Sequence, residues 1–158
     1  MKILVLILLL ISLVGCGVFN LDGFVIPDDP AFLAVVESLD TPVRICQYMQ
    51  ENFTYKLYRY AAFSPYTLWK TQKGDCNDFS TFAIFCADWH GYETYQIRIF
   101  FKDSLMRHSL GIFVENGKYT YSSNRTYHPI NVDTFEEIVS DCINKYGGEL
   151  SYFEVSNG

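Results

Sequence analysis

The clearest signal for the fold is in residues 74–91, whose sequence is GDCNDFSTFAIFCADWHG. Asp75 is a good helix N-cap, and Asp78 places a negative charge in the first turn, where the helix dipole favours one. Gly91 is typical of the residue just beyond a helix end. Apolar side chains recur every three or four residues, at Phe79, Phe82, Ala83, Cys86 and Trp89. The stretch therefore predicts a helix over about residues 76–90 with one face in the core.

Alternating polar and apolar residues after this helix predict strands. Residues 94–101 follow the period of two that is typical of a half-buried strand. A second strand is expected over residues 107–115 and a third over residues 118–123. The dipeptide Asn116-Gly117 between them is a strong signal for a tight hairpin turn. The two strands should therefore pair antiparallel.

Other capping and turn signals complete the expected fold. Thr41 is a good N-cap, and Pro42 suits the first position of a helix. Further elements are expected as a helix over residues 42–52, a helical turn near 67–72, a helix from Thr134 to Gly147 and a strand over 151–155. Because helices come first and antiparallel strands follow, the fold class is α+β.

Length and composition limit the possible classes of protein. The chain has 158 residues, of which 49% are hydrophobic and 17% aromatic, enough for one packed core. The formal net charge is −6, which is the wrong sign for a surface that binds phosphates. We therefore expect one folded domain that does not bind nucleic acid. We also expect a monomer.

The first residues have the pattern of an export signal. Lys2 precedes an apolar run over residues 3–12, a length that suits a signal peptide and is short for a membrane span. The run ends in Leu13-Val14-Gly15-Cys16, which resembles the bacterial lipobox, whose Cys is lipidated and becomes the new N-terminus. An uncleaved anchor is the alternative. We expect a signal peptide over residues 1–15, lipidated Cys16 and a tether over 16–30, and a domain over 31–158 in the cell envelope, outside the cytoplasm.

Four cysteines remain if Cys16 carries lipid. An even number in an exported protein suggests disulfides. Cys76 and Cys86 lie about 15 Å apart on one helix, so they cannot form a bridge. A bridge between Cys46 and Cys142 is conceivable, although buried free thiols are the commoner explanation.

Cys76 differs from the other cysteines by its position in the first turn of a helix. Backbone N–H groups and the helix dipole there favour the thiolate, the nucleophilic form. Asp75 and Asp78 act against the thiolate by like-charge repulsion, so an activated Cys76 needs a cationic partner. His108, at the start of an expected strand, is the natural partner if that strand packs on the helix.

These residues resemble the transglutaminase-like superfamily of cysteine enzymes. The resemblance lies in residues 73–80, which are similar to the Gly-x-Cys helix start of the family, in His108 on a strand, and in Gly117-Lys118-Tyr119 after the turn. It covers about residues 40–130. It implies a papain-like core in which a helix bearing the catalytic Cys packs on an antiparallel sheet. It also implies Cys76 as nucleophile, His108 as general base and acid, and a residue on the next strand that orients the imidazole.

That third residue departs from the Asp of the family. The family position falls on Ser123, with Asn124 beside it. A two-residue turn at Asn116-Gly117 would place Ser123 on the face of His108, whereas a three-residue turn would place Asn124 opposite His108. An amide orients an imidazole better than a hydroxyl does, so Asn124 is favoured over Ser123.

The sequence thus predicts an exported, lipid-anchored cysteine enzyme with Cys76, His108 and Asn124 as catalytic residues. It would cleave or transfer amide bonds of a peptide or protein substrate through a thioester on Cys76. The membrane would be a partner through the lipid on Cys16. No cofactor is implied, and Cys86 with His90 supplies too few ligands for a metal. The alternative is an inactive module with the same fold that binds a peptide or cell-wall ligand.

Overall fold

The computed structural model describes residues 20–21, 24–25, 27–58 and 61–158. Its helices are α1 Pro30–Ser38, α2 Pro42–Asn52, α3 Pro65–Thr71, α4 Cys76–Trp89 and α5 Phe135–Tyr146. Its short strands are β1 Asn20–Leu21, β2 Phe24–Val25, β3 Thr54–Tyr55 and β4 Lys73–Gly74. The longer strands are β5 Thr94–Phe101, β6 Arg107–Glu115, β7 Lys118–Ser123, β8 Thr126–Val132 and β9 Leu150–Asn157. This mixture confirms the α+β class.

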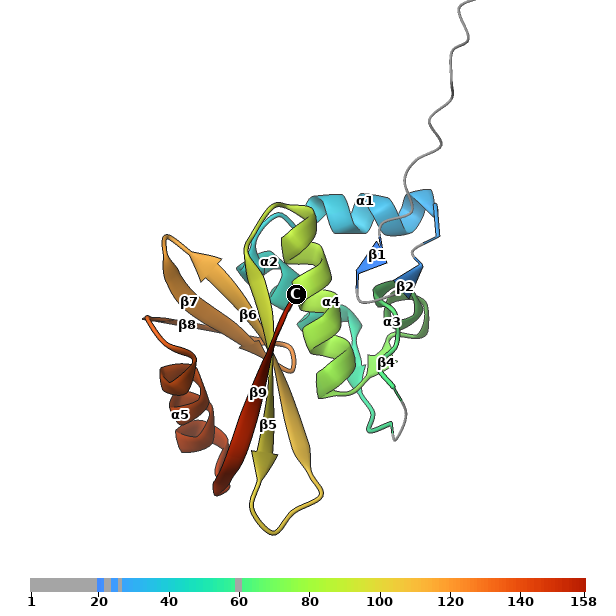
Figure 1. Ribbon diagram of the computed structural model, residues 1–158. Helices are drawn as coiled ribbons and strands as arrows, with labels where there is room; N and C mark the ends of the chain where they lie inside the picture. The colour runs from blue at the N-terminus through green and yellow to red at the C-terminus, as the bar shows by residue number, and fades with distance from the viewer. Residues whose placement is uncertain (1–19, 22–23, 26, 59–60) are drawn as a thin grey trace, which may run out of the picture.

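The longer strands form one antiparallel sheet in the order β8-β7-β6-β5-β9. Helix α4 lies on one side of this sheet and α5 on the other (Figure 1). Gln96 of β5 donates a hydrogen bond to Ser80 of α4, whereas Tyr121 of β7 donates one to Asp141 of α5. The sheet therefore has a core on each face, one shared with α1 to α4 and one shared with α5.

Local capping explains the helices that the sequence predicted. The Thr41 hydroxyl accepts the N–H of Arg44 at the start of α2, and the Thr134 hydroxyl accepts the N–H of Glu137 at the start of α5. Helix α4 begins with a capping box between Asp75 and Asp78. The expected helices over residues 42–52 and 76–90 and the helix after Thr134 are confirmed, as is a short helix at residues 65–71.

The strands over residues 94–101, 107–115 and 118–123 are confirmed, and the last strand is longer than expected. Strand β8 was missed by the sequence analysis. It lies at the edge of the sheet, where Pro129 is tolerated because an edge strand leaves some N–H groups unpaired. A proline within a strand weakens the sequence signal, which explains the omission.

Helix α1 was also missed, because Pro30 was assigned to the end of a tether. Asp29 caps the helix, and its carboxylate accepts the N–H groups of Ala31 and Phe32. Phe32 and Val36 are completely buried. Within the expected tether over residues 16–30, β1 pairs with β2, so the ordered fold starts before residue 31.

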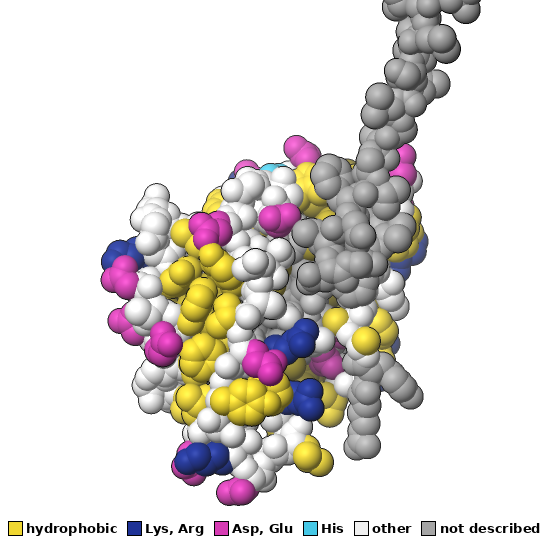
Figure 2. Space-filling model, viewed as in Figure 1, with side chains coloured by type: hydrophobic (Ala, Val, Ile, Leu, Met, Phe, Trp, Pro, Cys, Tyr) yellow, Lys and Arg dark blue, Asp and Glu magenta, His cyan; other side chains and the backbone are white. Residues whose placement is uncertain are grey.

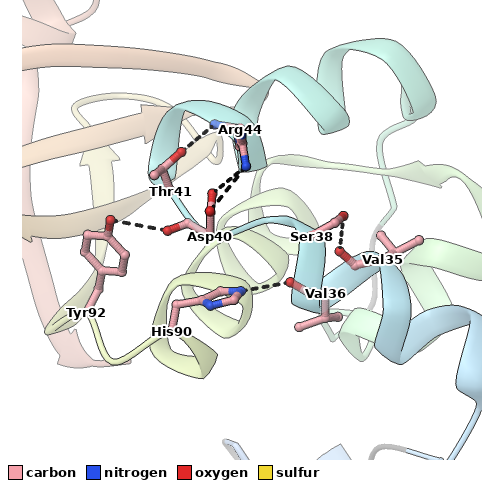
Figure 3. A network of polar contacts seen from close by, with 8 residues as sticks. All are labelled: Val35, Val36, Ser38, Asp40, Thr41, Arg44, His90 and Tyr92. Atoms are coloured by element: carbon pink, nitrogen blue, oxygen red, sulfur yellow. Dashed lines mark hydrogen bonds and ion pairs between the residues drawn. The ribbon is translucent and has the colours of Figure 1, made fainter.

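The junction between α1 and α2 is held against the end of α4 (Figure 3). His90 Nε2 lies 3.0 Å from the carbonyl oxygen of Val36, and the hydroxyl of Tyr92 donates to the carbonyl of Asp40 at 3.4 Å. The carboxylate of Asp40 accepts hydrogen bonds from Arg44. His90 therefore has a structural contact with the backbone.

The described cysteines are all free thiols: Cys46, Cys76, Cys86 and Cys142. Cys46 and Cys142 belong to cores on opposite faces of the sheet, which is why the conceivable bridge between them does not form. Burial raises the pKa of each of these two thiols to about 12.

Across the part of the chain that the structure describes, no helix has both the length and the apolar character needed to cross a membrane. The expected signal peptide over residues 1–15 and the expected lipidation site at Cys16 lie outside the described residues.

Candidate active site

Cys76 is the first residue of α4, and the local sequence fixes it there. The Asp75 carboxylate accepts the N–H groups of Asn77 and Asp78, and the Asp78 carboxylate accepts the N–H of Asp75 at 2.8 Å. A Cβ at Gly74 would lie 2.7 Å from a methyl carbon of Leu68 and 2.8 Å from Cβ of Asp78. Only glycine fits that close approach, so the Gly-Asp-Cys order has a packing reason of its own.

The two acids also hold the segment that precedes α3. The carboxylate of Asp75 accepts the N–H of Tyr58 at 3.2 Å, and that of Asp78 accepts the N–H of Phe63 at 2.6 Å. Their oxygens are therefore used as backbone acceptors. The structure assigns both residues to positioning Cys76 at the helix start.

The sulfur of Cys76 lies against the backbone of β6. Its thiol donates to the carbonyl oxygen of Arg107, with Sγ 3.9 Å from that oxygen, and the N–H of Ser109 is also directed to the sulfur. These contacts flank His108 on both sides. Burial, together with the charge of Asp75, raises the pKa of the thiol, against the opposing effect of the N–H of Ser109. Cys76 is partly exposed, whereas the three other described cysteines are buried.

His108 has its own partner on the neighbouring strand. Its Nε2 lies 2.9 Å from Oγ of Ser123, and burial lowers the pKa of the imidazole. The ring of Tyr146, the last residue of α5, has its centroid 6.3 Å from that of His108. His108 is therefore held as a neutral imidazole beside α5.

The expected contact between the sulfur and the imidazole is not formed. A Cβ at Gly111 would lie 3.5 Å from Cβ of Ala83 in α4, so Gly111 faces α4. Residues of a strand alternate between faces, and His108, three residues earlier, faces the opposite side. Among the described side chains no hydrogen bond joins Cys76 to His108: the sulfur is directed to the backbone of Arg107 and Ser109, whereas the imidazole is engaged by Ser123. The expectation of a resting thiolate paired with an imidazolium is likewise not supported, since the pKa of the thiol is raised and that of the imidazole lowered.

The hairpin has the two-residue turn, and this corrects the preference for Asn124. Glu115 pairs with Lys118, while Asn116 and Gly117 have φ of 55° and 75°. This register puts Ser123 on the face of His108. Asn124 instead starts the turn between β7 and β8 with φ of 49°, a left-handed conformation that asparagine adopts readily. Its Oδ1 is buried and has no hydrogen-bond partner among the described residues.

A second imidazole near the site could not be located from the sequence. His128 stacks on Tyr121 with ring centroids 4.4 Å apart, and its Nε2 lies 3.0 Å from the hydroxyl of Tyr146. Lys145 Nζ is 3.3 Å from Nδ1 of His128. Tyr146 thus adjoins both imidazoles, an arrangement that depends on which face of the sheet α5 covers. No local sequence pattern carries that information.

Neither a scan against models of known protein families nor a search of curated proteins finds a match to this chain. The transglutaminase-like resemblance therefore rests on the residues around Cys76 and His108.

Proposed function

We propose that this protein is an exported, lipid-anchored cysteine enzyme with a transglutaminase-like, papain-like core, and that it acts on amide bonds of peptides or proteins. One observation carries the proposal. A partly exposed Cys76 begins α4 and contacts the backbone on both sides of His108, whose Nε2 is bound by Ser123 on the next strand. Cys at a helix start, His on a strand and a polar residue on the adjacent strand follow the order of that superfamily.

The pKa directions favour general-base catalysis from a neutral pair. At neutral pH Cys76 is a thiol and His108 an uncharged imidazole, since burial acts on both. As the sulfur attacks the carbonyl carbon, the imidazole accepts the thiol proton and then gives it to the leaving amine. The C–N bond breaks and an S–C bond remains as the thioester. Water then gives hydrolysis, and an amine gives transamidation.

Ser123 is the residue that orients the imidazole in this mechanism. Its hydroxyl engages Nε2, which leaves Nδ1 to receive the thiol proton. For this proton transfer, the sulfur of Cys76 and the imidazole of His108 must lie within hydrogen-bonding distance in the substrate complex. Catalytic hydrogen bonds are often long in free enzymes and shorten when substrate binds.

Trapping of the thioester tests the proposal. The protein is incubated with p-nitrophenyl acetate, and acetylation of each cysteine is followed by mass spectrometry. We expect acetylation at Cys76, loss of it in Cys76→Ala, and a rate at least about tenfold lower in His108→Ala, as is typical when a general base is removed. Cys142→Ala is the matched control, since this thiol is buried. Equal acetylation of Cys76 with and without His108 would overturn the proposal.

An inactive binding module is the second candidate, and one observation favours it. A hydroxyl occupies the position at which the family has a carboxylate, and the sulfur and imidazole are not hydrogen-bonded. Such a module would bind a peptide or cell-wall ligand without forming a thioester. The acetylation experiment separates the two, because a binding module has no need of a His108-dependent thiol.

A further inference from the structure

A stacked row of side chains lies beside Cys76 on the α4 face of the sheet. Phe100 of β5 is directly opposite Tyr152 of β9 on one side and Arg107 of β6 on the other. The two aromatic rings stack with centroids 4.2 Å apart and planes 10° from parallel. The guanidinium carbon of Arg107 lies 5.2 Å from the centroid of Phe100. The guanidinium is thus held in place as the third layer of a stack.

This row is open to solvent. Gln96, four residues before Phe100 on the same strand, is covered by α4 through its hydrogen bond to Ser80. Helix α4 begins at Cys76, and the hairpin of β5 and β6 extends past that end of the helix with no other described helix over it (Figure 1). Tyr152 is 50% exposed. In Figure 2, basic and acidic side chains lie beside an exposed hydrophobic group at the lower part of the molecule.

Arg107 has no carboxylate partner among the described residues. Lys102, on the loop side of the same hairpin, pairs with Glu149. Glu154 of β9 lies opposite Arg98 rather than Arg107, and no ion pair joins Arg107 to Asp103 of the hairpin loop. The N–H fork of a guanidinium matches a carboxylate in two parallel hydrogen bonds. A stacked guanidinium that forms no such pair is preorganised to bind one from a ligand.

We propose that Arg107 determines specificity by binding a carboxylate of the substrate, an inference that rests on the proposed function. The carbonyl oxygen of Arg107 itself lies 3.9 Å from Sγ of Cys76. The backbone of Arg107 therefore adjoins Cys76, and we expect a carboxylate on its guanidinium to lie within a few residues of the amide that Cys76 attacks, since an extended peptide advances about 3.5 Å per residue. The substrate class is a peptide with a carboxylate next to the reactive amide. That carboxylate is either an acidic side chain or a free C-terminus.

Matched alkylating reagents test this inference through the rate of labelling at Cys76. N-Iodoacetyl-glycine carries a terminal carboxylate, and N-iodoacetyl-glycinamide is its neutral counterpart. The α-amides of N-iodoacetyl-aspartic acid and N-iodoacetyl-asparagine form the corresponding side-chain pair. We expect the ratio of acid to amide rates, normalised to free cysteine in solution, to be about tenfold for at least one pair, because a charge-assisted hydrogen bond is worth about that factor. The pair that shows it identifies the source of the carboxylate.

Variants of Arg107 and Lys102 distinguish an effect of the guanidinium group on this ratio from an effect of positive surface charge in general. Arg107→Gln should reduce the ratio to about one, and Arg107→Lys should give an intermediate ratio because it keeps the charge without the fork. Lys102→Gln removes one positive charge from the same hairpin and should leave the ratio within about twofold of wild type. Efficient labelling of Cys76 without preference for the acid would overturn this inference and leave the proposed function standing. If Cys76 prefers the acid reagents in a way that depends on Arg107, but its labelling rates do not change in His108→Ala, the proposed function alone is overturned. If no reagent labels Cys76, both are overturned.

Discussion

Replacing Ser123 with Asp is expected to increase the alkylation rate of Cys76 by iodoacetamide about tenfold at pH 8.5, where the imidazole remains uncharged in both proteins. Ser123 Oγ lies 2.9 Å from Nε2 of His108, so the new carboxylate would adjoin the imidazole. A carboxylate at that distance stabilises the imidazolium and raises its pKa, by about 1 to 3 units in comparable pairs. Burial lowers the pKa of His108 in the present protein, and Asp would oppose that effect. A more basic imidazole is a stronger general base for the thiol proton, so the reaction of the sulfur is faster when the imidazole is uncharged.

Ser123→Asn is the matched control, because it has nearly the same shape as Asp without the charge. It should change the rate by less than about twofold if the charge is responsible. The pKa of His108 is measured in parallel from its imidazole NMR signals. A raised His108 pKa without faster alkylation of Cys76 would show that the imidazole does not act on this sulfur.

Phe32→Ala is expected to lower the free energy of unfolding by about 3 to 5 kcal/mol, the usual cost of truncating a buried aromatic side chain. Phe32 of α1 is completely buried, and its ring centroid lies 5.4 Å from those of Tyr66 and Trp69. Its ring also stacks on Phe85 of α4, at 5.9 Å. The substitution therefore leaves a cavity between α1, α3 and α4. Urea unfolding followed by tryptophan fluorescence measures the loss.

Val43→Ala in α2 is the control, since Val43 is 51% exposed and should cost less than about 0.5 kcal/mol. A loss below about 1 kcal/mol for Phe32→Ala would mean that α1 is not part of the cooperative unit. It would place the start of the cooperative unit after α1, later than the boundary at residue 31 that the sequence indicated.

Elements with a local physical cause could be predicted from the sequence. Thr41, Asp75 and Thr134 cap their helices through their own side chains, so the start of each helix is encoded within four residues. The alternation in β5, β6 and β7 likewise gave the bounds of those strands. The position of Cys76 at a helix start follows from the same local rules.

Features that depend on contacts distant in sequence could not be predicted. Strand β9 pairs with β5, a pairing about 55 residues apart for which no turn signal exists. The face of the sheet that α4 covers is the one that Gly111 presents, and no local pattern in the sequence revealed that His108 faces the other side. The sequence around Asn116-Gly117 is compatible with a two-residue or a three-residue turn. Asn124 was therefore favoured because an amide orients an imidazole better than a hydroxyl does. In the structure both turn residues have a left-handed φ, which is the two-residue turn, and this turn places Ser123 on the face of His108.

The central claim is that His108 serves Cys76 as a base, and the pH profile of Cys76 alkylation tests it most directly. Iodoacetamide labelling is read at Cys76 by mass spectrometry from pH 5 to pH 10, in wild type and in His108→Ala. Because burial lowers the imidazole pKa and raises the thiol pKa, we predict two rises with increasing pH in wild type. The first lies below the ordinary histidine pKa of about 6.5, and the second lies above the ordinary thiol pKa of about 8.5. His108→Ala should lose the first rise and keep the second, whereas the same single rise in both proteins would contradict the claim.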